Sequence, residues 1–344
     1  AYYNREQYGE QKLFYGPQFS DTYAGLDPET PYLDGKPNYE RDYKTGKYII
    51  TNNFKNATQN TDDAHKALLP RMWSNEHNVN YMTFGEPLEF RINPEYSHED
   101  ELVQIVTDFR KAYATGEVDL KGYDKFLKTY GEYLIVDKPS FVTNMKFMFQ
   151  YQFGYMYMRY LLWNFVGRQN DEQGKYEDLK GNWITGIDVI DEFFIGSQKN
   201  LPSDIANNKA RNIYFGIPFI LALIGLVFHA KRDIKSFYVL LVLFLFTGLA
   251  LKIYLNERPF EPRERDYALV GSFYVFAMWI AFGIYAIFDW IKQYLAPKVA
   301  IPVVLVVCLL ASPVLTAKEN WDDHDRSDKH TALAMAKAYL DSSE

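Results

Sequence analysis

Four long apolar runs in the second half of the chain constrain its fold more than any other feature. Each run is 16 to 21 residues long, close to the ~20 residues that a helix needs to cross ~30 Å of hydrocarbon. Inside a bilayer the backbone must satisfy its own hydrogen bonds, so such runs are expected to be helical. The predicted spanning helices are Ile213–Phe228, Phe237–Leu255, Ala268–Phe288 and Val299–Ala317. Together they predict an α-helical integral membrane bundle.

The first part of the chain has a different composition. It is polar and tyrosine-rich, and turn-forming pairs such as Gly16-Pro17 and Asp34-Gly35 interrupt it. Apolar spacing predicts helices at Ser97–Ala114 and Tyr123–Tyr130, and a short helix with Ile184, Ile187, Ile190 and Phe194 on one side. The expected divisions are a mixed, loop-rich extracytoplasmic region over 1–140, an interfacial helix and polar connection over 141–211, the transmembrane bundle over 212–317, and the start of a C-terminal extracytoplasmic helical domain over 318–344.

Lysine and arginine in the short loops predict the orientation of the bundle. The loop after the first run contains Lys231, Arg232 and Lys235, and the loop after the third contains Lys292 and Lys298. Both loops are therefore predicted to be cytoplasmic. The connection between the second and third runs then faces the opposite side, the periplasm, together with the polar regions at either end of the segment.

A further helix is predicted over Thr143–Val166, and its composition is compatible with two positions, across the membrane or in its interface. It is long enough to span, but its apolar residues are aromatic side chains and methionines, and it carries Gln152 and Arg159. This composition suits a helix lying in the membrane interface at least as well as a span. Because the segments before and after it are predicted to lie outside, we expect the helix not to cross.

The connection between the second and third runs is short and densely charged. Pro259 and Pro262 prevent a continuous helix there. Its three arginines are suited to a phosphate at the membrane surface, because a guanidinium binds phosphate oxygens bidentately. They are Arg258, Arg263 and Arg265, and the four acids beside them are Glu257, Glu261, Glu264 and Asp266. The alternative is that these acids neutralise the arginines in a structural ion-pair network.

Arg159, Arg168 and Asp171 form a second candidate group beside the aromatic helix. An arginine on a mostly apolar helix needs a phosphate or a partner, and the alternative partner is an acid of the charged turn. No metal site is predicted: the run Asp322–Asp325 offers consecutive side chains that point in different directions. The net charge of −7 argues against a nucleic-acid partner.

Several long motifs carry a resemblance to a known family. They are Tyr254–Tyr267 with Gly271–Tyr274, Arg159–Asp171, Gly181–Trp183 and Glu319–Arg326, together with the shorter segments Tyr3–Gly9 and Pro70–Met72. In these segments the chain resembles a Bacteroidetes-type bacterial membrane-protein family related to protein O-mannosyltransferases, in the multi-spanning C-type glycosyltransferase class. Members of that family carry further membrane helices before this segment and a helical-repeat domain after it. The resemblance therefore implies an internal piece of a larger protein.

The resemblance also implies a function in the bacterial inner membrane. The protein would transfer a sugar from a polyprenyl-phosphate donor to Ser or Thr of an exported protein, with no cofactor and with membrane lipid around it. The donor phosphate would be bound by residues among Arg258, Arg263, Arg265, Arg159 and Arg168, with Glu264, Asp266 and Asp171 as polar support. The catalytic acid of this class is expected outside the segment.

Two alternatives stay open on the sequence. The tyrosine-rich outer region and the missing catalytic loop also fit a non-catalytic membrane scaffold that binds envelope proteins. A transporter is less favoured, because the four runs contain almost no ionisable residue near their centres.

Overall fold

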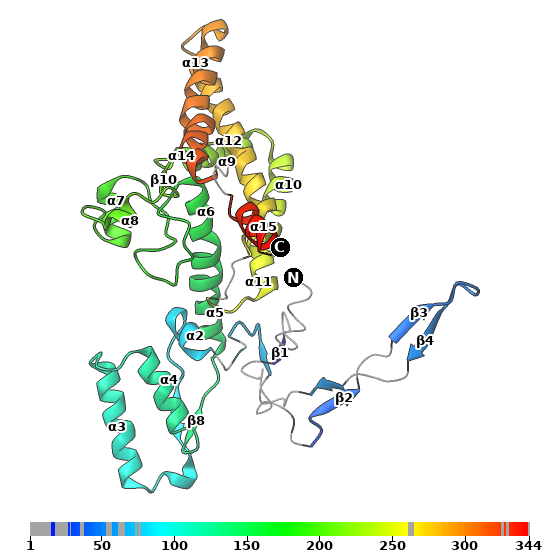
Figure 1. Ribbon diagram of the computed structural model, residues 1–344, viewed down its shortest axis with the longest axis vertical. Helices are drawn as coiled ribbons and strands as arrows, with labels where there is room; N and C mark the ends of the chain where they lie inside the picture. The colour runs from blue at the N-terminus through cyan, green and yellow to red at the C-terminus, as the bar shows by residue number, and fades with distance from the viewer. Residues whose placement is uncertain are drawn as a thin grey trace. The chain divides into compact units, whose positions relative to one another are not determined.

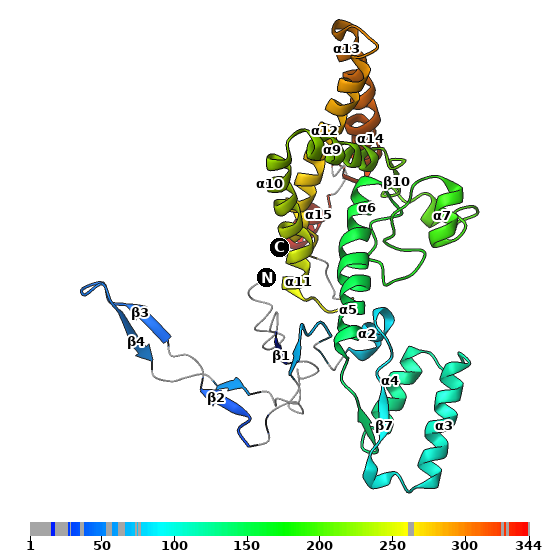
Figure 2. The ribbon, with the colours of Figure 1, turned by 180° about the vertical axis from the view of Figure 1, so that it is seen from behind.

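The computed structural model describes residues 15–17, 27, 29–34, 38–52, 57–60, 66–72, 74, 77–260, 265–324, 327 and 330–342. The described elements are mostly helical and fall into two compact units (Figure 1, Figure 2). Unit 1 comprises Ala1–Gly154 with Lys252–Arg263, and unit 2 comprises Tyr155–Leu251 with Glu264–Glu344. Each unit is therefore built from two separate stretches of the chain.

The described strands of unit 1 form short antiparallel pairs. The pairs are β1 (Tyr15–Pro17) with β6 (Lys66–Leu68), β2 (Tyr32–Asp34) with β5 (Ala57–Gln59), β3 (Asn38–Arg41) with β4 (Tyr48–Asn52), and β7 (Phe90–Ile92) with β8 (Leu134–Val136). Only the last of these pairs packs into the described hydrophobic core, described next.

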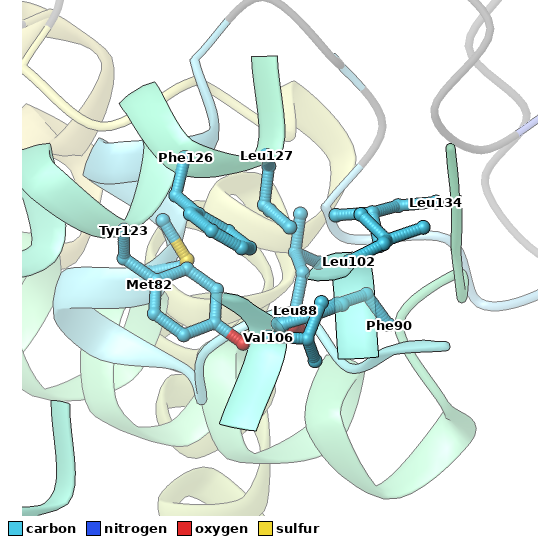
Figure 3. Packing of buried hydrophobic residues seen from close by; sticks show 9 residues of the cluster. All are labelled: Met82, Leu88, Phe90, Leu102, Val106, Tyr123, Phe126, Leu127 and Leu134. Carbon is cyan, nitrogen blue, oxygen red and sulfur yellow. Dashed lines mark hydrogen bonds between the residues drawn. The ribbon is translucent and has the colours of Figure 1, made fainter. Parts of the chain in front are cut away.

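Helices α3 (Asp100–Ala114) and α4 (Leu120–Thr129) lie side by side and enclose the main core of unit 1 with β7, β8 and α2 (Asn78–Phe84) (Figure 1). The rings of Phe109 and Phe126 stack with their centroids 3.7 Å apart. Figure 3 shows the nine buried residues of this core, which are Met82, Leu88, Phe90, Leu102, Val106, Tyr123, Phe126, Leu127 and Leu134.

Both helices predicted in this region are confirmed, with shifted starts. Helix α3 begins at Asp100 and not at Ser97, because the Ser97 hydroxyl donates to the Pro94 carbonyl (2.8 Å) in the preceding 3-10 turn η3 (Pro94–Tyr96). Helix α4 begins at Leu120, where the Asp119 carboxylate accepts from the Gly122 amide (2.7 Å).

A long aromatic helix follows, built from α5 (Phe141–Phe147), the π-helical stretch η4 (Met148–Met158) and α6 (Arg159–Phe165). It starts where the Ser140 hydroxyl accepts from the Thr143 amide (3.1 Å). Its second half belongs to unit 2, where the side chains of Tyr157 and Leu161 are buried with α12.

Beyond α6, the remaining helices and helical turns succeed one another along the chain. They are α7 (Asp188–Ile195), α8 (Ser203–Ala206), α9 (Ile217–Arg232), α10 (Ile234–Leu245), the π-helical η5 (Phe246–Ala250), α11 (Leu251–Leu255), the 3-10 turn η6 (Asp266–Leu269), α12 (Val270–Ile291), α13 (Pro297–Leu309), the π-helical η7 (Leu310–Val314), α14 (Leu315–His324) and α15 (Thr331–Asp341). Only Leu251 of α11 falls in unit 2, because the rest of that helix, from Lys252 on, belongs to unit 1. Helices α9 and α10 both pack on α12.

The described residues contain three helices that are long and apolar enough to cross a membrane: Ile234–Leu255, Tyr267–Ile291 and Pro297–Asp322. They coincide with the second, third and fourth predicted runs. The first predicted run forms α9, which has 16 residues. It starts late because Asn212–Ile213 pairs as β10 with β9 (Gly167–Arg168), and Phe215 and Gly216 then adopt positive φ. The predicted four spans are therefore corrected to three candidate spans and a shorter helix.

The interfacial helix predicted at Thr143–Val166 is also corrected. The second half of this helix packs into the bundle, where the hydroxyls of Tyr157 and Ser272 of α12 form a hydrogen bond. A Cβ at Gly248 would lie 2.6 Å from the Tyr157 ring, so the glycine provides the space that the tyrosine occupies. The composition of this helix predicted a position in the membrane interface, whereas its second half packs against α12 and η5.

Candidate functional site

A group of buried polar side chains surrounds Lys252–Phe260 in unit 1, the segment that contains the first half of the charged turn. We call this group the turn cluster; its buried members are Arg71, Asn144, Gln152, Lys252, Asn256 and Glu257, and its half-buried members are His77 and Arg258. Arg71 and Asn144 are fully buried, at 0% exposed. Charged residues are rarely buried to this extent, so the cluster is the strongest site candidate in the described structure.

The backbone of the turn adopts a positive φ at both ends of its described first part, Asn256–Phe260. Asn256 has φ +46° directly after the last helical residue, and Phe260 has φ +59°. Asparagine tolerates the left-handed region, whereas a bulky aromatic residue rarely adopts it. The Phe260 ring packs on Phe84 with a centroid distance of 5.6 Å, which helps to hold this conformation. Backbone outliers of this kind concentrate at functional sites.

Hydrogen bonds from distant parts of unit 1 fix the shape of the turn. The Asn256 side-chain amide donates to the Pro70 carbonyl (3.0 Å), and the Gln152 side-chain amide donates to the Asn256 side-chain oxygen (3.1 Å). The Tyr151 hydroxyl donates to the Arg258 carbonyl (3.0 Å). The turn is thus held by residues of the aromatic helix and by the segment that precedes α2.

Arg71 is a member that the sequence-based selection of site residues missed. Its Nη1 donates to the Ile253 carbonyl (2.7 Å) near the end of α11. The backbone amides of Arg71 and Met72 both donate to the Asn144 side-chain oxygen, at 2.7 and 3.0 Å. These partners lie far away in the chain, so no local pattern around Arg71 indicates its burial. Gln152, a polar residue within an aromatic helix, did offer a local signal.

One acid of the charged turn has a clear ion-pair partner. Glu257 Oε2 lies 2.7 Å from Lys252 Nζ, and the two side chains are only 6% and 3% exposed. The alternative of an acid network around the arginines can be followed for this acid alone. Glu261 and Glu264 lie outside the described residues, and the side chain of Asp266 does too.

The arginines of the charged turn separate between the units. Arg258 belongs to unit 1, where its guanidinium contacts His77 Nε2. Arg263 lies outside the described residues. Arg265 belongs to unit 2 and is half-buried, and its carbonyl accepts from the Ala268 amide (3.0 Å) at the start of η6.

The second candidate group has structural contacts in unit 2. The Arg159 guanidinium lies 4.3 Å from the Tyr155 ring centroid and donates to the carbonyls of Tyr155 and Gly181. The Arg168 guanidinium lies 4.1 Å from the Trp163 ring centroid. Cation–π contacts of this kind stabilise packing. Asp171 is exposed. The structure therefore gives both arginines a role in holding the loop after α6.

The composition of the turn cluster favours anion binding. Three of its members are cationic, namely Arg71, Lys252 and Arg258, against one acid, Glu257, which pairs with Lys252, so the cluster has a net positive charge. Within the described part of the chain, no three His, Cys, Asp or Glu side chains gather as metal ligands. An anion held by guanidinium and amide donors is the chemistry that these residues support.

Comparison with known proteins adds one match. Residues 9–149 match a family of unknown function (DUF8416). This stretch contributes Arg71, His77 and Asn144 to the turn cluster but ends before Lys252–Phe260. No curated protein matches the chain, and no solved structure matches it.

Proposed function

We propose that this chain is part of a membrane glycosyltransferase resembling the protein O-mannosyltransferases. It transfers a sugar from a polyprenyl-phosphate donor to Ser or Thr of exported proteins, and the turn cluster receives the donor phosphate. One observation carries the proposal: the turn that directly follows the candidate span Ile234–Leu255 contains Arg258 and is contacted by Arg71, and Lys252 at the end of the span offsets the charge of Glu257.

The position of the turn cluster along the chain suits a lipid-linked donor. Lys252 lies in the last turn of the candidate span, and Asn256 is the first residue after it. The end of an apolar spanning helix marks the level of the lipid headgroups. A polyprenyl phosphate has its phosphate at the same level when its chain lies in the bilayer. The orientation predicted from the basic loops places this end of the helix on the periplasmic side of the inner membrane.

Glycosyl transfer requires cationic groups at such a position. The acceptor hydroxyl oxygen bonds to the anomeric carbon as the bond from that carbon to the phosphate oxygen breaks. The departing polyprenyl phosphate keeps the electron pair and gains negative charge. Guanidinium groups positioned before the reaction stabilise this charge as it develops. The base that accepts the hydroxyl proton is expected outside this segment.

The test uses the intact protein in vesicles with polyprenyl-phosphate hexoses and an exported Ser/Thr-rich acceptor. We expect Arg258→Gln to lower the transfer rate about 100-fold, because it removes a charged donor from the developing phosphate charge. Arg91→Gln is the matched control: Arg91 is an exposed arginine of the same unit, 3.9 Å from Asp137. This control should transfer at the wild-type rate.

Two outcomes would contradict the proposal. One is a folded Arg258→Gln variant that transfers sugar as fast as the wild type. The other is an intact protein that transfers no sugar from any of the polyprenyl-phosphate hexoses. A stable envelope partner that co-purifies without donor binding would then favour the scaffold alternative.

A further inference from the structure

Helix α7 has an inverted distribution of polar and apolar side chains. Its one buried residue is an acid, Asp191. Four of its five apolar side chains are exposed, of which Val189 and Phe193 reach 81% and 82%, and the fifth, Ile195, is half-buried. Ile190 and Phe194 are exposed on the same side of the helix. An ordinary surface helix turns such a face toward the core, so this face is built to meet something other than water.

The Asp191 carboxylate fixes α7 in this orientation. Its Oδ1 accepts from the amide (2.7 Å) and the hydroxyl (2.8 Å) of Thr185, and its Oδ2 accepts from the Gly186 amide (2.8 Å). Gly186 has φ +75°, and a Cβ there would lie 2.3 Å from the Ile213 side chain. The loop before the helix therefore holds the acid inward, and the apolar residues on the opposite side of α7 point outward.

The loop that carries α7 starts and ends at one place in unit 2. Before α7, the Ile184 amide donates to the Gly167 carbonyl (3.1 Å), and Trp183 forms a bridge with Arg168. After α8, Asn212–Ile213 pairs with the same two residues as β10 with β9. Figures 1 and 2 both show α7 and α8 to one side of α6.

The pairing of β9 with β10, where the loop starts and ends, is connected by hydrogen bonds to the end of a candidate span. The Ile213 amide donates to the Glu319 carboxylate (3.3 Å), and the Tyr214 hydroxyl donates to the Asn320 side-chain oxygen (2.9 Å). Glu319 and Asn320 are polar residues near the end of Pro297–Asp322. A spanning helix passes from hydrocarbon into the headgroups where its sequence turns polar. The loop with α7 therefore leaves unit 2 at headgroup level.

We propose that α7 is a membrane-surface anchor. It lies in the plane of the bilayer and inserts Val189, Ile190, Phe193 and Phe194 into the boundary between headgroups and acyl chains, as short amphipathic helices do. Asp188 and Glu192 flank the apolar face and stay at the water side. This proposal does not depend on sugar transfer, because it rests on the contacts of unit 2 alone.

The size of the apolar face favours lipid over a protein partner. An eight-residue helix is roughly 12 Å long. A stable protein interface buries about 800 Å² on each partner, far more than one such face offers. Lipid requires no matching surface, and the loop already lies where the neighbouring span meets the headgroups.

The test places an environment-sensitive NBD probe on the full-length protein in phosphatidylethanolamine–phosphatidylglycerol vesicles. Cys308 is the only cysteine of this sequence, so Cys308→Ser, with any cysteine outside the sequence also replaced by serine, gives a background without thiols. Phe193→Cys places the probe on the apolar face, and Glu192→Cys places it on the exposed polar side of the same helix. Lipids with a nitroxide near the headgroup should quench the probe at 193 about threefold more than the probe at 192. Aqueous iodide should show the opposite preference.

Two results would overturn the proposal. Equal quenching by iodide at both positions would show that the face stays in water. Protection of the probe at 193 from both iodide and nitroxide lipid would show that protein covers the face. Both substitutions are at exposed positions of one short helix, so both variants should fold. A circular dichroism spectrum that matches the wild type verifies this for each variant.

Discussion

Tyr123 illustrates how burial sets the chemistry of a single side chain in this protein. It is 7% exposed, and its hydroxyl donates to the Leu88 carbonyl (2.7 Å). Burial disfavours the phenolate and raises the pKa of Tyr123 to about 12. In the unfolded chain the pKa stays near ~10, so the unfolded state loses this proton first. The stability that Tyr123 contributes is therefore complete below pH ~10 and is lost as the pH rises toward ~12.

Tyr123→Phe tests this assignment. We expect the variant to lose about 1 kcal/mol of unfolding free energy at pH 7, because the buried Leu88 carbonyl loses its hydrogen bond. The difference between variant and wild type should shrink between pH ~10 and ~12. Urea unfolding followed by circular dichroism measures both effects. Tyr113→Phe, which alters a half-buried ring 4.8 Å from Tyr123, is the control. An equal loss in the two variants would contradict the prediction.

At the scale of elements, the tightest contact in unit 2 joins α9 and α12. A Cβ at Gly225 would lie 1.8 Å from the Trp279 carbonyl oxygen, and one at Gly283 would lie 2.0 Å from the Leu221 carbonyl oxygen. Small residues allow such close approach of helices in membrane proteins. The two helices run in the same direction here, since Phe219 stacks on Phe276 and Phe228 packs on Tyr285.

Alanine at either glycine should force the two backbones apart. We expect Gly225→Ala and Gly283→Ala each to destabilise unit 2 by more than about 3 kcal/mol, because the clash is with backbone atoms that cannot rotate away. Thermal unfolding in detergent measures the loss. Gly271→Ala on the same α12 is the comparison, since its Cβ meets only the Thr247 side chain at 3.1 Å. If all three variants melt together, the close packing of α9 on α12 does not limit stability.

At the scale of the whole molecule, the three candidate spans and α9 imply an orientation. The spans Ile234–Leu255, Tyr267–Ile291 and Pro297–Asp322 alternate in direction. Arg232 at the end of α9 lies over the Tyr285 ring near the end of α12, so the loop at Asp233 and the loop at 292–296 share one side. Both loops are basic or flanked by basic residues, which predicts the cytoplasmic side.

Cysteine labelling of spheroplasts tests this orientation on the Cys308→Ser background. Tyr267→Cys, at the first residue of the span Tyr267–Ile291, should react with a membrane-impermeant maleimide from outside. Gln293→Cys should react only after the membrane is opened. Both positions are exposed, so reactivity reports the side of the membrane. The reverse pattern would place the turn cluster in the cytoplasm and remove the donor-site proposal.

The sequence by itself determined the features that depend on local composition. An apolar stretch of about twenty residues is spanning length whatever surrounds it, so Phe237–Leu255, Ala268–Phe288 and Val299–Ala317 were found from sequence. The 3.6-residue period of α3 and α4 is equally local. The charged turn was also selected as a candidate site from the sequence, and its residues 261–264 lie outside the described residues.

Only the tertiary structure decided which side chains meet. Arg71 reaches Ile253 and Asn144 across 182 and 73 residues of chain, and no local pattern encodes such pairs. Strand pairing at Asn212 moved the start of α9 from Ile213 to Ile217, and packing on Gly248 buried Tyr157. The predicted helix face combined Ile184 and Ile187 with Ile190 and Phe194, but α7 begins at Asp188, after both of the first two residues. Periodicity shows that a helix has two faces, and only the contacts of Asp191 show which one turns inward.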